Sequence, residues 1–393
     1  MGYFRCVLSI KRHISVALVL FINLIFALKY LPRYSKHGQV FAFMLVGVLA
    51  LIYVLNEKER FNDVLIRLKK WMAVLGAFTI VLPVGLAILA QLSIPVEALN
   101  VDRWSVVDAF WSALRAGDYP YLAQSHMGNY PGPMPFYFVL CLPFYLFGEL
   151  SYFSAFGYVL IGYFLCKRMR AGRFNLSIVL ISLSAVYMLW EITTRSNIVS
   201  NSVLILGSFI YLESYDFKGF STNKLIICSA MLGLMLSTRS VFALVYVIYF
   251  IQQFRLVENK KRVFILGFLS ALCFVITFLP FIAAYGEQFF EINPFVIQSS
   301  FLIPAGYTLG FFVVAVQFGF QSKGGTDFYF WSGLSLFVAI LIYLVYHWVM
   351  VGWNDAFYGS VVDISYFLLS LPFLIYFVLH QPESVKYNRS IDK

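Results

Sequence analysis

The feature that most constrains this chain is a series of long apolar runs that recurs along its whole length. A membrane-spanning helix needs about 20 mostly apolar residues, and helices satisfy all their backbone groups within one lipid-exposed segment. The sequence therefore predicts an all-α, polytopic transmembrane bundle that forms a single integral membrane domain over residues 1–393. The twelve expected helices cover 14–31, 39–55, 72–92, 150–166, 176–191, 197–214, 224–238, 241–254, 263–284, 299–318, 330–350 and 364–380.

Composition agrees with this interpretation. Hydrophobic residues make up 61% of the chain and charged residues 12%, against about 25% charged in a typical soluble domain. The five cysteines are scattered and include no CxxC spacing, so neither a disulfide nor a cysteine-based metal site is expected.

Residues 134–148 form one further apolar segment, but it is short and contains Pro135 and Pro143. A proline inside a helix removes a hydrogen bond and costs about 3 kcal/mol. If this segment does not cross, 22 of the 29 Lys and Arg residues lie inside and six outside; if it crosses, the numbers are 10 and 18. Cytoplasmic loops carry the excess of Lys and Arg. The charges therefore favour a re-entrant or interfacial segment and two cytoplasmic termini.

The longest expected outer segment covers residues 93–133, and 134–148 extends it. Connections in compact domains usually have about 4–6 residues, and longer ones tend to be functional. This segment mixes aspartates and arginines with aromatic rings, as sugar-binding surfaces often do. The alternative is a packed cap without chemistry. The expected substrate-binding residues are Tyr119, Tyr121, His126, Asn129 and Tyr130, with Glu191 from the next short outer turn.

Two aspartates of this segment, Asp102 and Asp108, are candidates for a general base. They are six residues apart, so they do not share one helical face. Asp102 follows the third expected helix directly. It is also a preferred residue type to cap a surface helix through 106–114, and the two roles are compatible.

Arginines at the outer ends of helices run against the usual charge bias, so each needs an anionic partner. Arg195 follows Glu191 by four residues, and an internal ion pair is the simplest explanation for it. Arg239, in the turn Ser237-Thr238-Arg239-Ser240, has no acidic neighbour in the sequence. A phosphate is a good partner for a guanidinium group.

Several of these stretches resemble the GT-C superfamily of polyprenyl-phosphate-sugar-dependent glycosyltransferases. The resemblance covers roughly residues 95–260 and includes a turn similar to Ser237-Thr238-Arg239. It is carried by Asp102-Arg103-Trp104-Ser105, Gly117-Asp118-Tyr119-Pro120-Tyr121, Tyr130-Pro131-Gly132-Pro133-Met134-Pro135-Phe136-Tyr137, Leu146-Phe147-Gly148 and the basic helix end Lys167-Arg168-Met169-Arg170.

The resemblance implies transfer of one sugar from a polyprenyl-phosphate donor to a glycan or lipid-linked acceptor on the non-cytoplasmic face. Asp102 or Asp108 is then the base, and Arg239, Arg195 and Arg103 hold the phosphate. The aspartates form no DxD pair, so no metal or other cofactor is expected, and three helices precede the acidic loop where one is usual in the superfamily.

Three other functions fit parts of the pattern. A polysaccharide polymerase or ligase of a different fold also handles lipid-linked sugars, but often places its large outer loop later in the chain. A transporter would favour mid-membrane charges and two repeated halves, and an assembly subunit would not need unpartnered outer arginines. The absence of a Walker motif argues against transport driven by ATP. The positive charge reflects topology, so nucleic acid is not an expected partner.

Overall fold

The computed structural model of the chain describes residues 2–33, 35–56, 84–169, 186–213, 221–300, 303–359 and 361–379. Throughout these ranges the regular structure is helical, and they contain no strand. The all-α prediction is therefore confirmed for this part of the chain.

The N-terminal half contains α1 (Gly2–Tyr30), a 3-10 turn η1 (Leu31–Arg33), α2 (Gly38–Asn56), η2 (Val96–Ala98), α5 (Arg103–Ala116), η3 (Pro120–Leu122), α6 (Pro135–Leu146), α7 (Ser151–Met169) and α9 (Val186–Thr193). The C-terminal half contains α10 (Ile198–Glu213), α11 (Thr222–Leu236), η5 (Ser240–Phe242), α12 (Ala243–Leu256), α13 (Lys260–Ile276), α14 (Leu279–Glu291), α15 (Pro294–Ser300), α16 (Ala305–Gln321), α17 (Gly325–Val351), the π-helical turn η6 (Asn354–Tyr358), η7 (Ile364–Leu369) and α18 (Leu371–Leu379).

Two helices in the described ranges, Ser9–Arg33 and Thr326–Val351, are long and apolar enough to cross a membrane. The number rises to four if each of two bent helix pairs forms one span. Several other apolar helices have only 10–17 residues. The structure thus supports a protein with membrane-spanning character, while the twelve expected spans remain a prediction.

Five expected helices agree with the structure to within three residues at both ends: those at 39–55, 150–166, 197–214, 224–238 and 241–254 are α2, α7, α10, α11 and α12. The helix expected at 14–31 begins earlier, because α1 starts at Gly2. The helix expected at 263–284 is not continuous, because the chain bends by 54° between α13 and α14, and Pro280 begins the second helix. The helices expected at 72–92 and 176–191 lie mostly outside the described residues.

The segment 134–148 forms α6, which makes an angle of 108° with α7. Pro135 occupies the first turn of α6, where its missing N–H removes no helical hydrogen bond. Pro143 lies inside the helix, near its end. The short length of α6 and the sharp bend after it mean that this segment does not continue the direction of α7.

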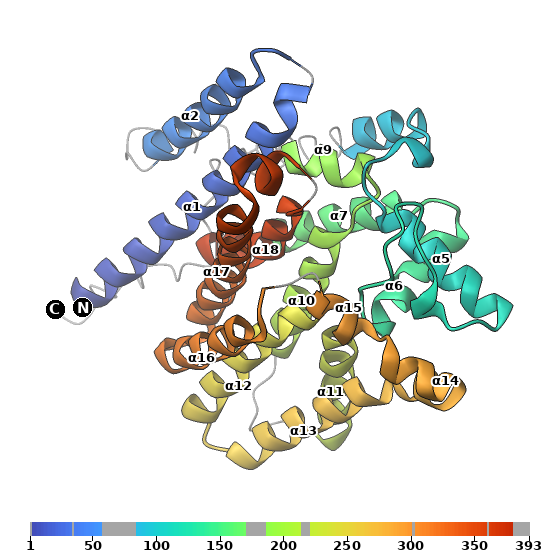
Figure 1. Cartoon of the computed structure of the whole chain (residues 1–393). Coiled ribbons are helices and arrows are strands. Elements are labelled where there is room, and N and C mark those ends of the chain that lie inside the picture. The colour runs from blue at the N-terminus through green and yellow to red at the C-terminus, as the bar shows by residue number, and fades with distance from the viewer. Residues whose placement is uncertain are drawn as a thin grey trace.

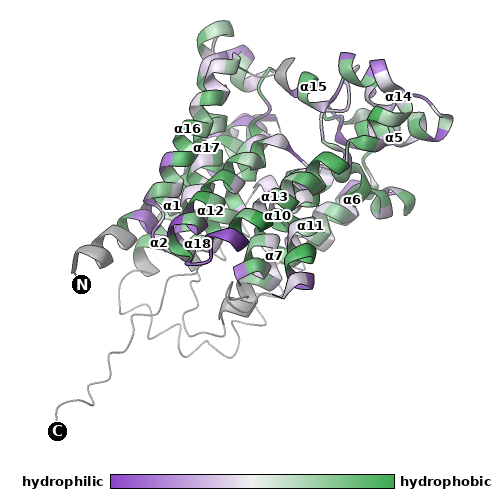
Figure 2. Cartoon of the chain, turned by 90° about the horizontal axis from the view of Figure 1, so that it is seen from below, coloured by the Kyte–Doolittle hydropathy of each residue, from purple (hydrophilic) through white to green (hydrophobic). Residues whose placement is uncertain are grey.

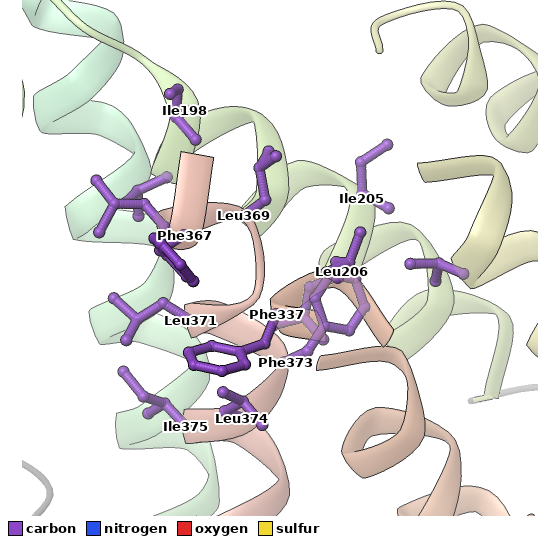
Figure 3. Close-up of a cluster of buried hydrophobic side chains, with 14 of the residues drawn as sticks. Ile198, Ile205, Leu206, Phe337, Phe367, Leu369, Leu371, Phe373, Leu374 and Ile375 are labelled. Atoms are coloured by element: carbon purple, nitrogen blue, oxygen red, sulfur yellow. The ribbon is translucent and has the colours of Figure 1, made fainter. Parts of the chain in front are cut away.

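The main core lies where α10, α17 and α18 pack together with η7 (Figure 3). Phe367, Phe373 and Leu374 are completely buried there. Close approach between α7 and α10 depends on Gly157, because a Cβ atom at this position would overlap Ser200. Burial of this cluster holds the helices that surround the cavity described below.

A second cluster of buried side chains joins α5, α6 and α14. Phe110 and Phe138 stack in it with parallel rings 3.6 Å apart. These helices lie together on the side of the molecule farthest from the N-terminus, in both Figure 1 and Figure 2. The outer segment expected from the sequence is thus a folded helical cap and not an irregular loop.

Candidate functional site

A cavity of about 1220 Å³ lies between the cap and the bundle. Its walls come from the C-terminal end of α1, the N-terminal end of α5, the 127–137 stretch, the 190–194 turn, the 239–244 turn, and segments near 297–312, 339–343 and 358–369. Side chains that are ionised at neutral pH line it, namely Lys29, Arg33, Asp102, Arg103, Arg239 and Asp363. Four cations against two carboxylates give this wall a net positive charge.

Asp102 lines the cavity and is held from one side. Its Oδ2 atom accepts hydrogen bonds from Ser125 Oγ at 2.9 Å and from Asn129 Nδ2 at 2.7 Å. Asp102 stands at the N-cap position of α5, but its side chain caps no backbone N–H. The side-chain capping role considered for Asp102 is therefore wrong, because Ser125 and Asn129 occupy the carboxylate instead. Its Oδ1 atom has no hydrogen bond to any described residue, so it remains free to accept a proton.

Asp108 lies about 1.7 turns further along α5 and does not line the cavity. Its Oδ1 accepts a hydrogen bond from the Tyr145 hydroxyl at 2.7 Å, and Arg115 donates to the same hydroxyl. The two aspartates are thus separated, as their spacing indicated, and only Asp102 faces the cavity.

Arg239 also lines the cavity. The backbone just before it is hydrogen-bonded to the start of α6. The first N–H groups of a helix lack partners within the helix. The N–H of Phe136, in the first turn of α6, donates to Ser237 O at 2.9 Å, and the N–H of Met134, the N-cap residue, donates to Thr238 O at 3.1 Å. The turn that carries Arg239 therefore acts as a backbone cap for α6.

The guanidinium of Arg239 lies 5.3 Å from the centroid of the Tyr137 ring. Its Nε atom is buried and makes no hydrogen bond, and no described carboxylate pairs with it. Ser240 donates to Gln298 Oε1, and Gln298 Nε2 donates to Gly132 O at 2.6 Å, which fixes the next residue of the turn. Arg239 is consequently a cation without an anionic partner in the described part of the chain.

Arg103 is buried and forms an ion pair with Asp363, and it donates a hydrogen bond to Ser365 Oγ at 2.7 Å. Burial on its own would raise the pKa of Asp363, but the Arg103 guanidinium and hydrogen bonds from Ser365 hold that pKa below its ordinary value. This pair ties the first residue of α5 to η7. Arg103 therefore reaches the cavity with its charge already compensated.

Arg195 is placed differently from the other arginines. Its side chain is buried away from the cavity, pairs with Glu149 at 3.4 Å, and donates to Gln91 O and Ile94 O. Glu191 does not pair with Arg195. Its carboxylate accepts from Ser196 Oγ and from the first N–H groups of α10, so the simple four-residue ion pair is wrong. Neither Arg195 nor Glu191 lines the cavity.

The expected substrate-binding residues divide into two groups. Asn129 and Tyr130 line the cavity. Tyr119 and Tyr121 are buried in the cap and donate to Ile292 O and Pro133 O, while exposed His126 contacts Ser105 Oγ and Leu99 O. Contact between these three side chains and a substrate stays a prediction.

Lys29, Arg33 and Asp363 also line the cavity, although the sequence analysis names none of them as a site residue. The signal that points to all three is a charged residue at the end of an apolar helix on the expected outer side.

In the described ranges no group of three or more His, Cys, Asp or Glu side chains is arranged to hold a metal ion. No protein-family model matches the chain, and no curated protein or solved structure is significantly similar to it. The interpretation of the cavity therefore depends on its own geometry and charge.

Proposed function

We propose that the chain is a membrane glycosyltransferase of the GT-C type, and that this cavity is its active site on the non-cytoplasmic face. The observation that carries the proposal is one cavity that holds both a carboxylate with a free oxygen, Asp102, and a cation with no anionic partner, Arg239. These are the two groups that transfer from a sugar phosphate requires.

The residues that line the cavity support its proposed place on the non-cytoplasmic face. Residues from the expected outer segments 93–133, 192–196, 239–240, 285–298 and 351–363 contribute to it, together with Arg33 of the first outer turn. The described parts of the expected inner segments contribute none. If α6 crossed the membrane, the segments before and after it would open on opposite faces, and they would not share one cavity.

In the proposed reaction the acceptor hydroxyl oxygen attacks the anomeric carbon of the donor sugar. The bond between that carbon and the phosphate oxygen breaks, and the polyprenyl phosphate leaves with the bonding electrons. Asp102 takes the proton from the acceptor hydroxyl through its free Oδ1 atom. Arg239 stabilises the negative charge that grows on the departing phosphate, and it is fixed in place before the reaction begins.

The other side of the cavity is apolar, as a polyprenyl donor requires. Phe311 and Phe312 of α16 and Ala339 and Ile340 of α17 line it. A lipid-linked donor of this kind keeps its phosphate at the membrane surface and its chain among apolar side chains. The polar and apolar walls of this cavity match the two parts of such a molecule.

The test measures release of polyprenyl phosphate from a panel of polyprenyl-phosphate hexoses and pentoses by the purified, reconstituted full-length protein. We expect Asp102→Asn to lower the rate about 10²–10⁴-fold, the usual contribution of a general base. We expect Arg239→Gln to lower it about 10²-fold or more. Asp108→Asn is the matched control and should retain activity, because Asp108 does not line the cavity. Native activity in Asp102→Asn would contradict the assignment of the base.

A further inference from the structure

Two cations at the end of α1 form a separate feature of the cavity. Lys29, in the last turn of α1, and Arg33, in η1, both line its wall. The Lys29 side chain is only 6% exposed. Burying a lysine ammonium costs free energy unless its charge is paired. The groups around Lys29 therefore determine whether a bound anion would stabilise it.

The hydrogen bonds of Lys29 leave it incompletely satisfied. Its ammonium donates to Gly359 O and Val362 O, both at 3.3 Å, which is long for a charge-assisted hydrogen bond. An ammonium has three donors. In the described part of the chain the third has no partner. Arg33 makes no hydrogen bond or ion pair with any described residue, and its guanidinium lies 5.0 Å from the Tyr30 ring centroid.

The nearby carboxylate does not balance these charges. Asp363 is in an ion pair with Arg103 and also attracts Lys29, but one carboxylate cannot balance three cations. The four residues together therefore keep a net positive charge. Lys29 and Arg33 are four residues apart at one helix end, where like charges repel each other. A bound anion would remove both the repulsion and the unpaired donors.

We propose that Lys29 and Arg33 bind a second oxyanion, a phosphate or carboxylate carried by the acceptor, at a place distinct from Arg239. The assignment to the acceptor depends on the proposed function, which gives Arg239 to the donor phosphate. Lys29 is held by Gly359 O and Val362 O, and Arg33 follows it in η1, whereas the turn that carries Arg239 is held by α6 and Gln298. The substrate class that follows is an anionic glycan or an acceptor linked to a phosphorylated lipid.

Equilibrium binding of radiolabelled inorganic phosphate to the full-length protein in detergent tests this directly. The native protein should bind two phosphates, and the double variant Lys29→Gln/Arg33→Gln should bind one. The single variant Arg33→Gln should weaken that same site about tenfold or more, because hydrogen bonds to charged groups contribute that much. Arg33 is exposed, so this variant keeps the test valid if substitution of buried Lys29 prevents folding. Lys36→Gln is the matched control, since Lys36 is exposed in the same turn and does not line the cavity.

Arg239→Gln separates this inference from the proposed function. If Arg239→Gln keeps both phosphates while the Arg33 variant weakens one, the donor assignment fails and the second site stands. A single phosphate that is weakened equally by changes at Arg33 and Arg239 would overturn the inference. One inorganic pyrophosphate that displaces both phosphates would also overturn it, because the two cation groups would then serve one diphosphate donor.

Discussion

Replacement of Asp363 by asparagine should destabilise the protein, because it leaves Arg103 buried without its counter-charge. The Arg103 side chain is 9% exposed and that of Asp363 is 37% exposed. Breaking a fully buried pair costs about 3–5 kcal/mol, and an exposed pair contributes about 0–1 kcal/mol. With one partner buried and the other partly solvated, we expect a loss of about 2 kcal/mol, or a fall in Tm of about 2–3 °C for a chain of this length.

Thermal unfolding of the purified protein in detergent measures this change. Asp355→Asn is the matched control, because Asp355 is exposed in the same connection and should change stability by less than about 0.5 kcal/mol. The double variant Arg103→Met/Asp363→Asn should be more stable than Asp363→Asn alone, since it removes the buried charge. A Tm for Asp363→Asn equal to that of the native protein would refute the reasoning.

The same pair has a predictable pH dependence. The pKa of Asp363 lies below its ordinary value of 3.8, so the folded state favours the ionised carboxylate. Its stabilisation is therefore complete above the ordinary value and is lost as the pH falls through the lower, folded value. The difference in Tm between the native protein and Asp363→Asn should be constant above about pH 5 and should shrink below about pH 4. A difference that grows on acidification would show that the sign is wrong.

Two further substitutions test the geometry of the site and the packing beneath it. Asn129→Ala removes one of the two hydrogen bonds that orient Asp102. In the transfer assay we expect kcat to fall about tenfold with KM nearly unchanged. A change confined to KM would argue for direct substrate contact instead. Gly157→Ala places a methyl group against α10 and should lower the free energy of unfolding by about 1–3 kcal/mol. Gly47→Ala, with open space around it, should hardly change that free energy. Equal stability of the two variants would contradict the close packing.

Features that depend on local pattern were predictable from the sequence. The surface helix after Asp102 follows from its apolar spacing, and α6 follows from an apolar run too short to span. Features that depend on distant partners were not. Arg103 and Asp363 are 260 positions apart, so nothing in the sequence near either residue indicates their ion pair.

Backbone geometry explains a second difference. Arg195 has a positive φ of 54° just after α9 ends, so its side chain leaves the helical face that it would share with Glu191. It reaches Glu149 in the connection between α6 and α7 instead. Four-residue spacing indicates an ion pair only where the helix continues through both residues. The helix expected at 176–191 already ended before Arg195, so the spacing of Glu191 and Arg195 did not by itself support an ion pair.

The most direct test of the central claim is the side of the membrane on which the cap lies. Single cysteines at Leu122, Phe290 and Lys323, all exposed, would be introduced into a protein that lacks the five native cysteines. They would be treated with an impermeant thiol reagent in sealed cells. The account predicts that Leu122→Cys and Phe290→Cys react from outside and that Lys323→Cys reacts only after lysis. Reaction of Leu122→Cys and Phe290→Cys from opposite sides would mean that α6 crosses the membrane, and the single outer cavity would be contradicted.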